Sequence, residues 1–231
     1  DASLEYHQPL GKDIHLTVRG NFTYARNRIM DQDEPDYAYT YMNRSGQMQY
    51  QKFGLVAVGL FQDQEDIDSW AKQSFGEVKP GDIKYLDLNG DGVINGNDMK
   101  PMFWNGQPKM TFGITLYASW KGLDFNMLWS GAAKYTAKYN EVLGNVLALD
   151  SSNSPAFYYD RWHLADVYDP NSAWIPGKYP ATRRTDADNG ANRLESNMQR
   201  INAAHARLKN LELGYTLPVS YTHLTLPTNS L

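Results

Sequence analysis

The sequence predicts an all-β fold: part of a large antiparallel transmembrane β-barrel, open and incomplete in this chain, with long extracellular loops. Three observations predict it. Several long segments alternate apolar and polar residues with a period of two, as β-strands do. Tight turns and very long connections follow one another in alternation. An oxygen-rich loop near the middle of the chain has the spacing of a calcium-binding loop.

Composition excludes several classes of function. The chain has 231 residues, a formal net charge of -4 and no cysteine. The mildly acidic balance argues against nucleic acid as the main partner, and the lack of cysteine excludes disulfides, zinc-thiolate sites and thiol catalysis. No apolar run reaches the roughly 20 residues of a membrane helix. The 16 Tyr, 8 Phe and 6 Trp in a polar chain of mean hydropathy -0.59 fit a barrel with aromatic girdles or a glycan-binding β-domain.

The N-terminal part predicts two strands. Residues 3–6 alternate, residues 7–12 are expected to form a short turn, and from Ile14 to Tyr24 the alternation is clean over about a dozen residues. Strands of soluble domains more often have about five or six residues, whereas a tilted strand crossing a bilayer needs about 9 to 11. The length therefore favours a membrane wall.

Residues 27–108 are expected to form a long excursion. Residues 27–49 are polar loop, residues 50–61 are apolar and punctuated by glycine, and residues 62–72 predict a short helix. The calcium-type loop, residues 87–98, follows.

The loop pattern assigns a ligand to each position. Calcium takes six to eight oxygens, which a tight loop offers from alternate side chains and one backbone carbonyl. We expect the ligands to converge on one centre, with Asn95 acting through a water and a glycine at position six making the sharp turn. The predicted ligands are the side chains of Asp87, Asn89 and Asp91, the carbonyl of Val93, and Asp98 closing the shell.

The flanks of this loop predict a structural role for the ion. A calcium-sensing hand needs a helix on each side, but residues 82–86 read as extended and Pro101 prevents a helix from continuing after Asp98. The sequence therefore predicts a structural calcium ion that braces the loop between strands. The alternative is an Asn/Gly-rich turn that holds no ion.

Residues 109–130 are the clearest hairpin in the chain. Lys121 and Gly122 form a two-residue turn, so that residue 120 pairs with 123, 118 with 125 and 116 with 127. Both apolar sets then share one face of the sheet. We expect Ile114, Leu116, Phe125 and Met127 to face lipid, and Thr115, Asn126 and Glu212 to face water.

The last part of the chain contains a second long excursion, residues 136–204, and a final strand, residues 207–217. Long connections thus alternate with tight turns, which places all long loops at one end of the sheet. Outer-membrane barrels have this asymmetry, whereas a β-sandwich usually has shorter strands.

Several ordered motifs resemble one family. They are Gly59-Leu60-Phe61-Gln62 with Glu65-Asp66-Ile67, the run from Gly81 to Asp98, Lys121-Gly122-Leu123-Asp124-Phe125, and the run from Arg207 to Pro218. Together they are similar to the C-terminal barrel region of the SusC/RagA-type TonB-linked (TonB-dependent) outer-membrane transporters, over about residues 4–218.

The resemblance implies a closed barrel of about 22 strands around a plug, which imports glycans or other large nutrients through the outer membrane of a Gram-negative bacterium. It also implies three kinds of partner: TonB, a SusD-like surface lipoprotein and a glycan or peptide cargo. It implies further that residues 1–218 are a fragment without plug or signal peptide. Residues 219–231 resemble an adapter-derived, non-native tail.

Two other functions are open alternatives to transport. A secreted calcium-stabilised β binding module would share the loop pattern, but a dockerin-like module needs two loops with helices. A glycan-active enzyme could use loop carboxylates such as Asp160, Asp166 and Asp186, but nothing in the sequence places two of them at a working separation. We therefore expect no catalytic residues and no enzyme activity.

Overall fold

The computed structural model describes residues 1–138, 154–182 and 190–217. Within these residues the chain forms two compact units. The sheet unit comprises residues 1–26, 108–135 and 203–217, and the loop unit comprises the described residues of 27–107 and 136–202. The proposed tail, residues 219–231, lies outside the described residues.

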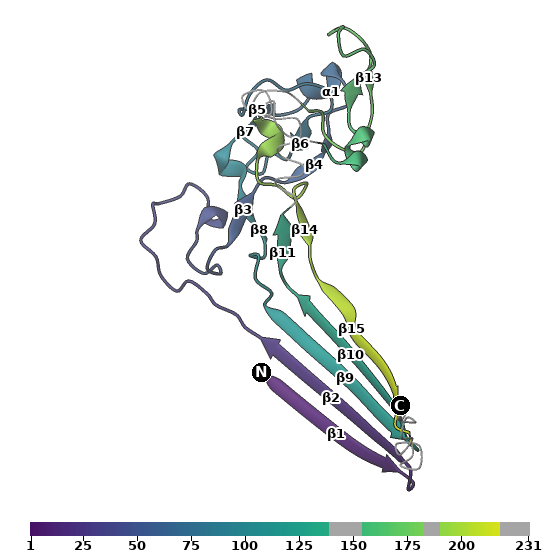
Figure 1. The fold of residues 1–231 in the computed structure, drawn as a ribbon. Helices are drawn as coiled ribbons and strands as arrows, with labels where there is room; N and C mark the ends of the chain where they lie inside the picture. Colours follow the sequence, from purple (N-terminus) through teal and green to yellow (C-terminus); the bar gives the residue numbers. More distant parts are fainter. Residues whose placement is uncertain (139–153, 183–189, 218–231) are drawn as a thin grey trace, which may run out of the picture. The chain divides into compact units, whose positions relative to one another are not determined.

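The sheet unit is one antiparallel sheet of long strands (Figure 1). Its strands are β1 (Ala2–Leu10), β2 (Ile14–Tyr24), β9 (Met110–Trp120), β10 (Leu123–Ala133) and β15 (His205–Tyr215), paired in the order β1-β2-β9-β10-β15. All but β1 have 11 residues, and β1 has 9. The fold is all-β and matches the predicted part of a large barrel wall, with β1 and β15 at its open edges.

The register sorts the side chains of this sheet into an apolar and a polar face. One row across all five strands is Tyr6, Val18, Leu116, Met127 and Leu211. The neighbouring row is His7, Thr17, Tyr117, Asn126 and Glu212. Because successive residues of a strand point to opposite sides, these rows lie on opposite faces. The predicted pairs 120/123, 118/125 and 116/127 are confirmed.

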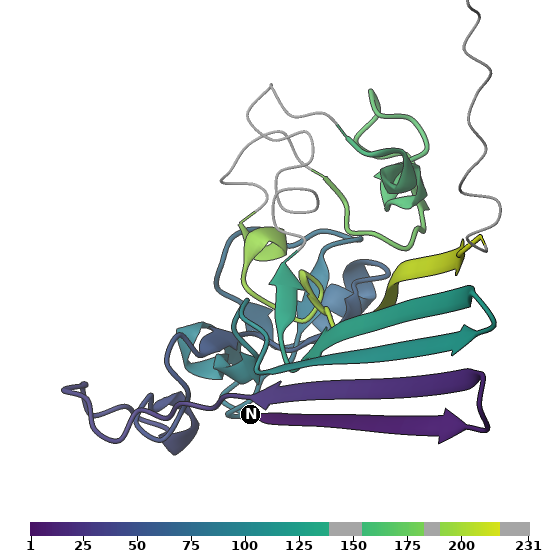
Figure 2. The same cartoon turned by 60° about the horizontal axis from the view of Figure 1, so that its bottom comes forward.

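Tight turns join the strands at one end of the sheet (Figure 2). Lys121 has φ 46° and Gly122 has φ 85°, the left-handed pair that a two-residue antiparallel hairpin needs. At the other end, Tyr24 pairs with Met110, Met110 with Ala133, and Ala132 with His205. Both long excursions therefore leave the sheet from this end.

Two predicted boundaries are wrong. The turn expected over residues 7–12 begins only after Leu10, because the edge position of β1 lets Pro9 stay in the strand without a ladder donor. The last strand begins at His205 and ends at Tyr215 instead of spanning 207–217. Pairing with Ala132 extends its start.

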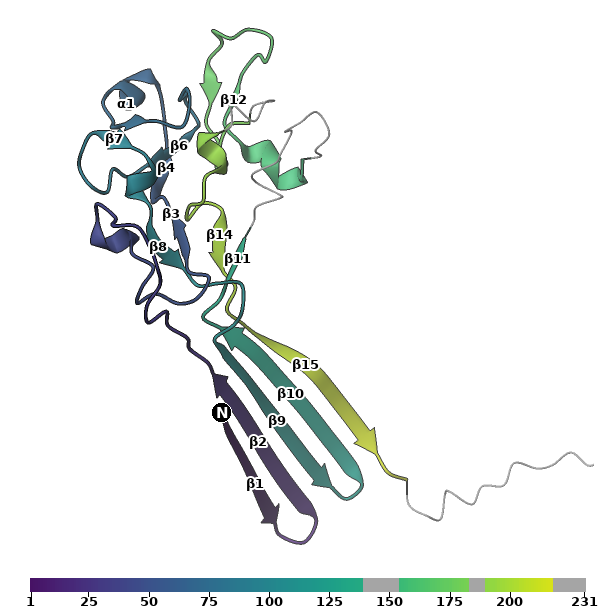
Figure 3. The same cartoon turned by 90° about the vertical axis from the view of Figure 1, so that its left-hand side faces the viewer.

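The loop unit consists of short strand pairs (Figure 3). The first excursion holds β3 (Lys52–Gly54) paired with β8 (Lys100–Phe103), β4 (Ala57–Leu60) with β6 (Ile83–Tyr85), and β5 (Lys72–Gln73) parallel to β7 (Val93–Ile94). The second holds β11 (Thr136–Lys138) with β14 (Arg200–Asn202), and β12 (His163–Leu164) with β13 (Trp174–Ile175).

Among the described residues, one α-helix and four 3-10 turns lie between these pairs. The predicted helix over 62–72 is confirmed as the shorter α1 (Gln64–Asp68), whose N-cap Asp63 accepts the backbone N–H of Asp66 at 2.8 Å. The 3-10 turns are η1 (Thr40–Met42), η2 (Gly96–Asp98), η4 (Ala156–Asp160) and η5 (Ala191–Arg193). No helix among the described residues is long and apolar enough to cross a membrane.

A small hydrophobic core holds the loop unit together. Leu55, Ala57, Ile83, Tyr85 and Ile94 form its buried cluster. The buried amide of Gln73 bridges the two end residues of β6, since it donates to the Ile83 carbonyl at 3.1 Å and accepts the Tyr85 N–H at 2.9 Å. Burial of the Tyr85 side chain raises the pKa of its hydroxyl. Ile94 anchors the calcium-type loop in this core.

Candidate functional site

The polar face of the sheet carries cross-strand contacts between hydrophilic side chains. Arg19 forms an ion pair of 2.8 Å with Glu5, and the His7 ring lies 2.9 Å from the Thr17 hydroxyl. Near the other edge, the Asn126 amide donates to Glu212 at 3.1 Å. These groups form a hydrated surface, because burying such charges in a protein core would cost free energy.

A concavity of about 370 Å³ lies on this face towards the β15 edge. Its walls include Tyr117, Asp124, Asn126 and Glu212. Gly214 leaves room for the Asp124 carboxylate, since a Cβ at this position would lie 2.1 Å from a carboxylate oxygen and the Asp124 side chain would have to turn aside. The predicted water-facing residues Asn126 and Glu212 thus come together, and Thr115 lies on the same face.

The opposite face exposes large apolar side chains. Leu213 is 73% exposed, Leu211 59% and Ile114 49%. Trp120, Leu123 and Tyr215 extend this surface to the end that carries the tight turns. A continuous apolar face of this size needs a cover, and a bilayer with an aromatic girdle at its boundary supplies one.

Hydrogen bonds from the backbone shape the calcium-type loop. The Asp87 carboxylate accepts the N–H groups of Gly90 at 2.7 Å and Gly92 at 2.8 Å. Asn89 accepts the N–H of Asp91 at 3.0 Å, and Asp91 accepts that of Val93 at 2.8 Å. Gly92 has φ 83°, so position six needs glycine for the turn, as the pattern predicts.

Asp98 closes the loop from the interior. Its side chain is fully buried, and its carboxylate accepts the N–H groups of Leu88 at 2.8 Å and Asn95 at 2.7 Å. Asn95 in turn accepts the N–H of Asn97 at 2.7 Å, and Asn95 and Asp98 together form a capping box at η2. One buried carboxylate therefore joins both ends of the loop.

Tyr41 attaches the preceding polar segment to this loop. Its hydroxyl donates to the Asn97 carbonyl at 2.6 Å. Burial raises the pKa of the Tyr41 hydroxyl first, and the negative charges of Asp98, Asp91 and Asp87 raise it further. The hydroxyl therefore lies in the combined field of all three loop carboxylates.

The loop has the right donor chemistry for calcium. All five predicted ligands offer oxygen, which hard cations prefer. Among the described residues, however, no three Asp, Glu, His or Cys side chains are grouped closely enough to hold a metal ion. The carboxylates of Asp87, Asp91 and Asp98 accept backbone N–H groups, and their convergence on one centre stays a prediction. Calcium binding stays a prediction.

Two of the other carboxylates considered in the sequence accept backbone N–H groups. Asp160 accepts the N–H of Lys178 at 3.3 Å, and Asp166 accepts that of Tyr168 at 2.9 Å. Asp186 lies outside the described residues. The loop aromatics divide into two kinds: Tyr158 and Trp162 are buried, whereas Tyr159 and Tyr168 are exposed. Burial raises the pKa of the Tyr158 hydroxyl to about 12.

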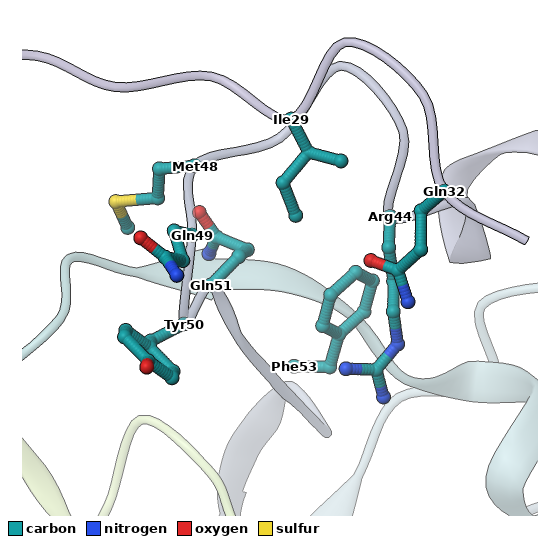
Figure 4. A pocket seen from close by; sticks show the side chains of 8 residues that line it. All are labelled: Ile29, Gln32, Arg44, Met48, Gln49, Tyr50, Gln51 and Phe53. Carbon is teal, nitrogen blue, oxygen red and sulfur yellow. The ribbon is translucent and has the colours of Figure 1, made fainter.

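A pocket in residues 29–53 was not anticipated from the sequence. It has a volume of about 200 Å³ and combines aliphatic, aromatic, amide and guanidinium groups (Figure 4). This segment has no periodicity, so no pattern predicted which of its side chains would gather. The dense run of glutamine, methionine and aromatic residues over 47–53 was the available signal.

Comparisons with known proteins agree with this architecture. No family model matches the chain. The chain is 26% identical over 168 residues to TonB-dependent receptor P26 of Formosa agariphila, covering 72% of this chain, and 26% identical over 238 residues to TonB-dependent receptor P3 of the same organism, covering 96%. Both relatives are named as receptors, not as enzymes.

Solved structures show the same fold. The RagAB peptide importer in its open-open state matches with a TM-score of 0.58 and 18% identity over 96% of this chain, and its closed-closed state with a TM-score of 0.57 and 20% identity over 96%. The chain spans 15% and 22% of the two receptors, and 22% and 23% of the two matched importer chains.

Proposed function

We propose that this chain, which by sequence and fold is part of a SusC/RagA-type TonB-dependent receptor, forms wall and extracellular loops of an outer-membrane transporter for large nutrients. The two-faced sheet carries the proposal. Its strands of 11 residues match the roughly 9 to 11 that a tilted strand needs to cross a bilayer.

The two faces have separate roles in this proposal. The face with Ile114, Leu116, Phe125 and Met127 lies against lipid, and the face with Thr115, Asn126 and Glu212 lines the aqueous interior. The ion pair and hydrogen bonds of the polar face support this division, because hydrated groups can stay there without desolvation. The tight turns then lie on the periplasmic side and the long excursions outside the cell.

The proposed partners follow from the relatives. Their name points to TonB as the source of energy, and the RagAB structures point to a second component, which we propose is a surface lipoprotein of the SusD type. The cargo is a glycan or a peptide too large for passive diffusion. We propose that the protein lies in the outer membrane of a Gram-negative bacterium.

Calcium has a structural part in the proposal. Asp87, Asn89, Asp91, Val93 and Asp98 would hold the ion, with Asn95 acting through a water. On calcium binding, the carboxylates of Asp87 and Asp91 would coordinate the cation in place of the backbone N–H groups that they accept here. It would thereby brace the extracellular excursion, while Ile94 keeps the loop fixed in the core.

Single cysteines test the wall assignment, because residues 1–231 contain no cysteine of their own. We would introduce Ile114→Cys or Thr115→Cys into the full receptor in outer-membrane vesicles and add a water-soluble maleimide. Position 115 should be labelled once the reagent can enter the lumen of the barrel. Position 114 should be labelled only after detergent extraction. Strong and equal labelling of both positions in intact vesicles, before any detergent is added, would refute the proposal.

A further inference from the structure

The pocket in residues 29–53 combines an apolar floor with groups that bind polar ligands (Figure 4). The floor comes from Ile29, Met48 and Phe53, of which Met48 is 7% exposed. Its volume of about 200 Å³ suits a single side chain with its attached backbone rather than an extended polymer. An aliphatic floor favours an apolar group.

Arg44 supplies a positive charge at the rim. Its guanidinium carbon lies 5.4 Å from the centre of the Phe53 ring, and it forms no ion pair within the described part of the chain. Glu34 interacts electrostatically with Arg44, and its carboxylate oxygens accept the backbone N–H groups of Arg44 at 2.8 Å and Ser45 at 3.0 Å. The fork of Arg44 therefore has N–H donors left for an external carboxylate.

Glutamine amides surround this charge. In Figure 4 the Gln32 amide lies beside the Arg44 guanidinium, and Gln49 and Gln51 lie on the side of Met48. Gln51 donates to the carbonyls of Lys52 and Phe103. The side-chain amides of Gln32 and Gln49 form no hydrogen bond with the rest of the described chain. An amide offers both a donor and an acceptor, which complements a peptide group.

Tyr50 adds a strained residue at the same place. Its φ is 60°, in the left-handed region that a tyrosine rarely adopts, and 72% of its surface is exposed. Such backbone conformations cost free energy and concentrate at sites that hold ligands. The exposed Tyr50 is also one of the residues that line the pocket.

We propose that this pocket binds the C-terminal residue of a short peptide with an apolar side chain. Arg44 takes the terminal carboxylate, the floor of Ile29, Met48 and Phe53 takes the side chain, and the glutamine amides contact the preceding peptide group. A sugar is the weaker candidate, because Arg44 covers a face of Phe53 and the aliphatic floor offers no partner to hydroxyls. The inference rests on the transporter proposal for the identity of the cargo.

Binding to the purified full-length receptor tests this site. The probe is an N-terminally fluorescent Gly-Gly-Leu with a free C-terminal carboxylate, compared with its C-terminal amide. We expect the acid to bind at least about tenfold more tightly than the amide, since an Arg–carboxylate pair is charge-assisted. Arg44→Gln should remove this preference. Arg28→Gln, the same change at an arginine of this segment that does not line the pocket, should keep it.

Three results would overturn the inference: equal binding of acid and amide, an Arg44→Gln variant that still prefers the acid, or displacement of the probe by neutral or acidic oligosaccharides only. Barrel insertion and uptake by cells are measured in parallel on the same variants. A wild-type receptor that does not insert into the membrane would refute the transporter proposal. Normal uptake without acid-selective binding would refute only the peptide site.

Discussion

Trp129 on β10 lies opposite Leu208 on β15, because the pairing of the two strands skips Lys209. In an uninterrupted strand, Leu208 would share its face with Asn210 and Glu212, two and four residues later. The bulge at Lys209 instead places Leu208 on the apolar face beside Trp129. The apolar surface therefore continues towards the end from which the excursions leave.

Deletion of Lys209 should be tolerated. It removes the extra residue but keeps Leu208 opposite Trp129 and Asn210 opposite Leu128. Deletion of Leu213 is the matched control, because the spare residue at Lys209 can absorb it only by turning Leu211 to the polar face and Glu212 to the apolar face. In the full receptor, heat-modifiable migration on gels should show folded yield within about twofold of wild type for the first deletion and a large loss for the second. Equal yields would contradict the assigned register.

Charges on the two faces should differ in cost. Ile114→Lys places a cation on the proposed lipid face and should lower the free energy of unfolding by about 2 to 4 kcal/mol, whereas Thr115→Lys should cost much less. Folding of the full barrel into lipid vesicles over a urea series measures both. If the two variants tolerate urea equally, the membrane-wall assignment fails.

Asp91→Ala should loosen the calcium-type loop without stopping barrel insertion. The substitution removes the acceptor for the Val93 N–H and one proposed ligand. Limited proteolysis of the full receptor should cleave between residues 62 and 108 faster in this variant, and chelator should accelerate cleavage of the wild type to a similar rate. Chelator without effect on the wild type would argue for a loop that holds no ion.

Calcium should lower the pKa of the Tyr41 hydroxyl. Burial raises this pKa first, and the charges of Asp98, Asp91 and Asp87 raise it further. A bound cation would offset those charges and make the phenolate easier to form. The difference in ultraviolet absorbance between wild type and Tyr41→Phe, titrated with calcium and with magnesium, isolates this group. Tyr50→Phe serves as the control, and an unchanged Tyr41 titration would count against an ion in the loop.

At acid pH, the part of the loop unit around Glu195 should lose stability. Burial favours a higher pKa for Glu195, but hydrogen bonds from Arg200 and Lys138 outweigh it and hold the pKa below its ordinary value. A lowered folded-state pKa stabilises the fold above the ordinary value of 4.5, and this contribution is lost as pH falls through the folded-state pKa. The loss should be about 1 kcal/mol after allowance for solvent screening.

Hydrogen exchange of the β11–β14 amides between about pH 6 and pH 3 measures this loss. Glu195→Gln should remove most of the pH dependence, whereas Glu77→Gln, a change at an exposed carboxylate whose ion pair with Lys79 spans only two residues, should leave it in place. A pH profile that is unchanged in Glu195→Gln would show that another group is responsible.

The sheet was predictable because its information is local. Ile14–Tyr24 shows a period of two, and Lys121-Gly122 fixes a hairpin whose register follows from the turn itself. The loop unit was less predictable because its partners are distant in sequence. The buried amide of Gln73 forms hydrogen bonds with β6, and β5 pairs parallel to β7. Neither interaction produces a periodic pattern in the sequence.

The candidate sites divide in the same way. The calcium-type loop has a spacing rule, so its glycine turn and the closing position of Asp98 could be predicted, whereas the direction of its carboxylates could not. The pocket around Arg44 depends on how an irregular segment folds back on itself, from Ile29 to Phe53. Only three-dimensional placement reveals it.

The position of the tight turns at one end of the sheet has an evolutionary consequence. The register of β1 with β2 and of β9 with β10 is set at that end, while both excursions begin and finish at the other. Residues can therefore be inserted into or deleted from an excursion without moving any strand against its neighbour. Related chains are free to exchange whole surface segments while the wall keeps its geometry, and tags or epitopes are best inserted into the excursions.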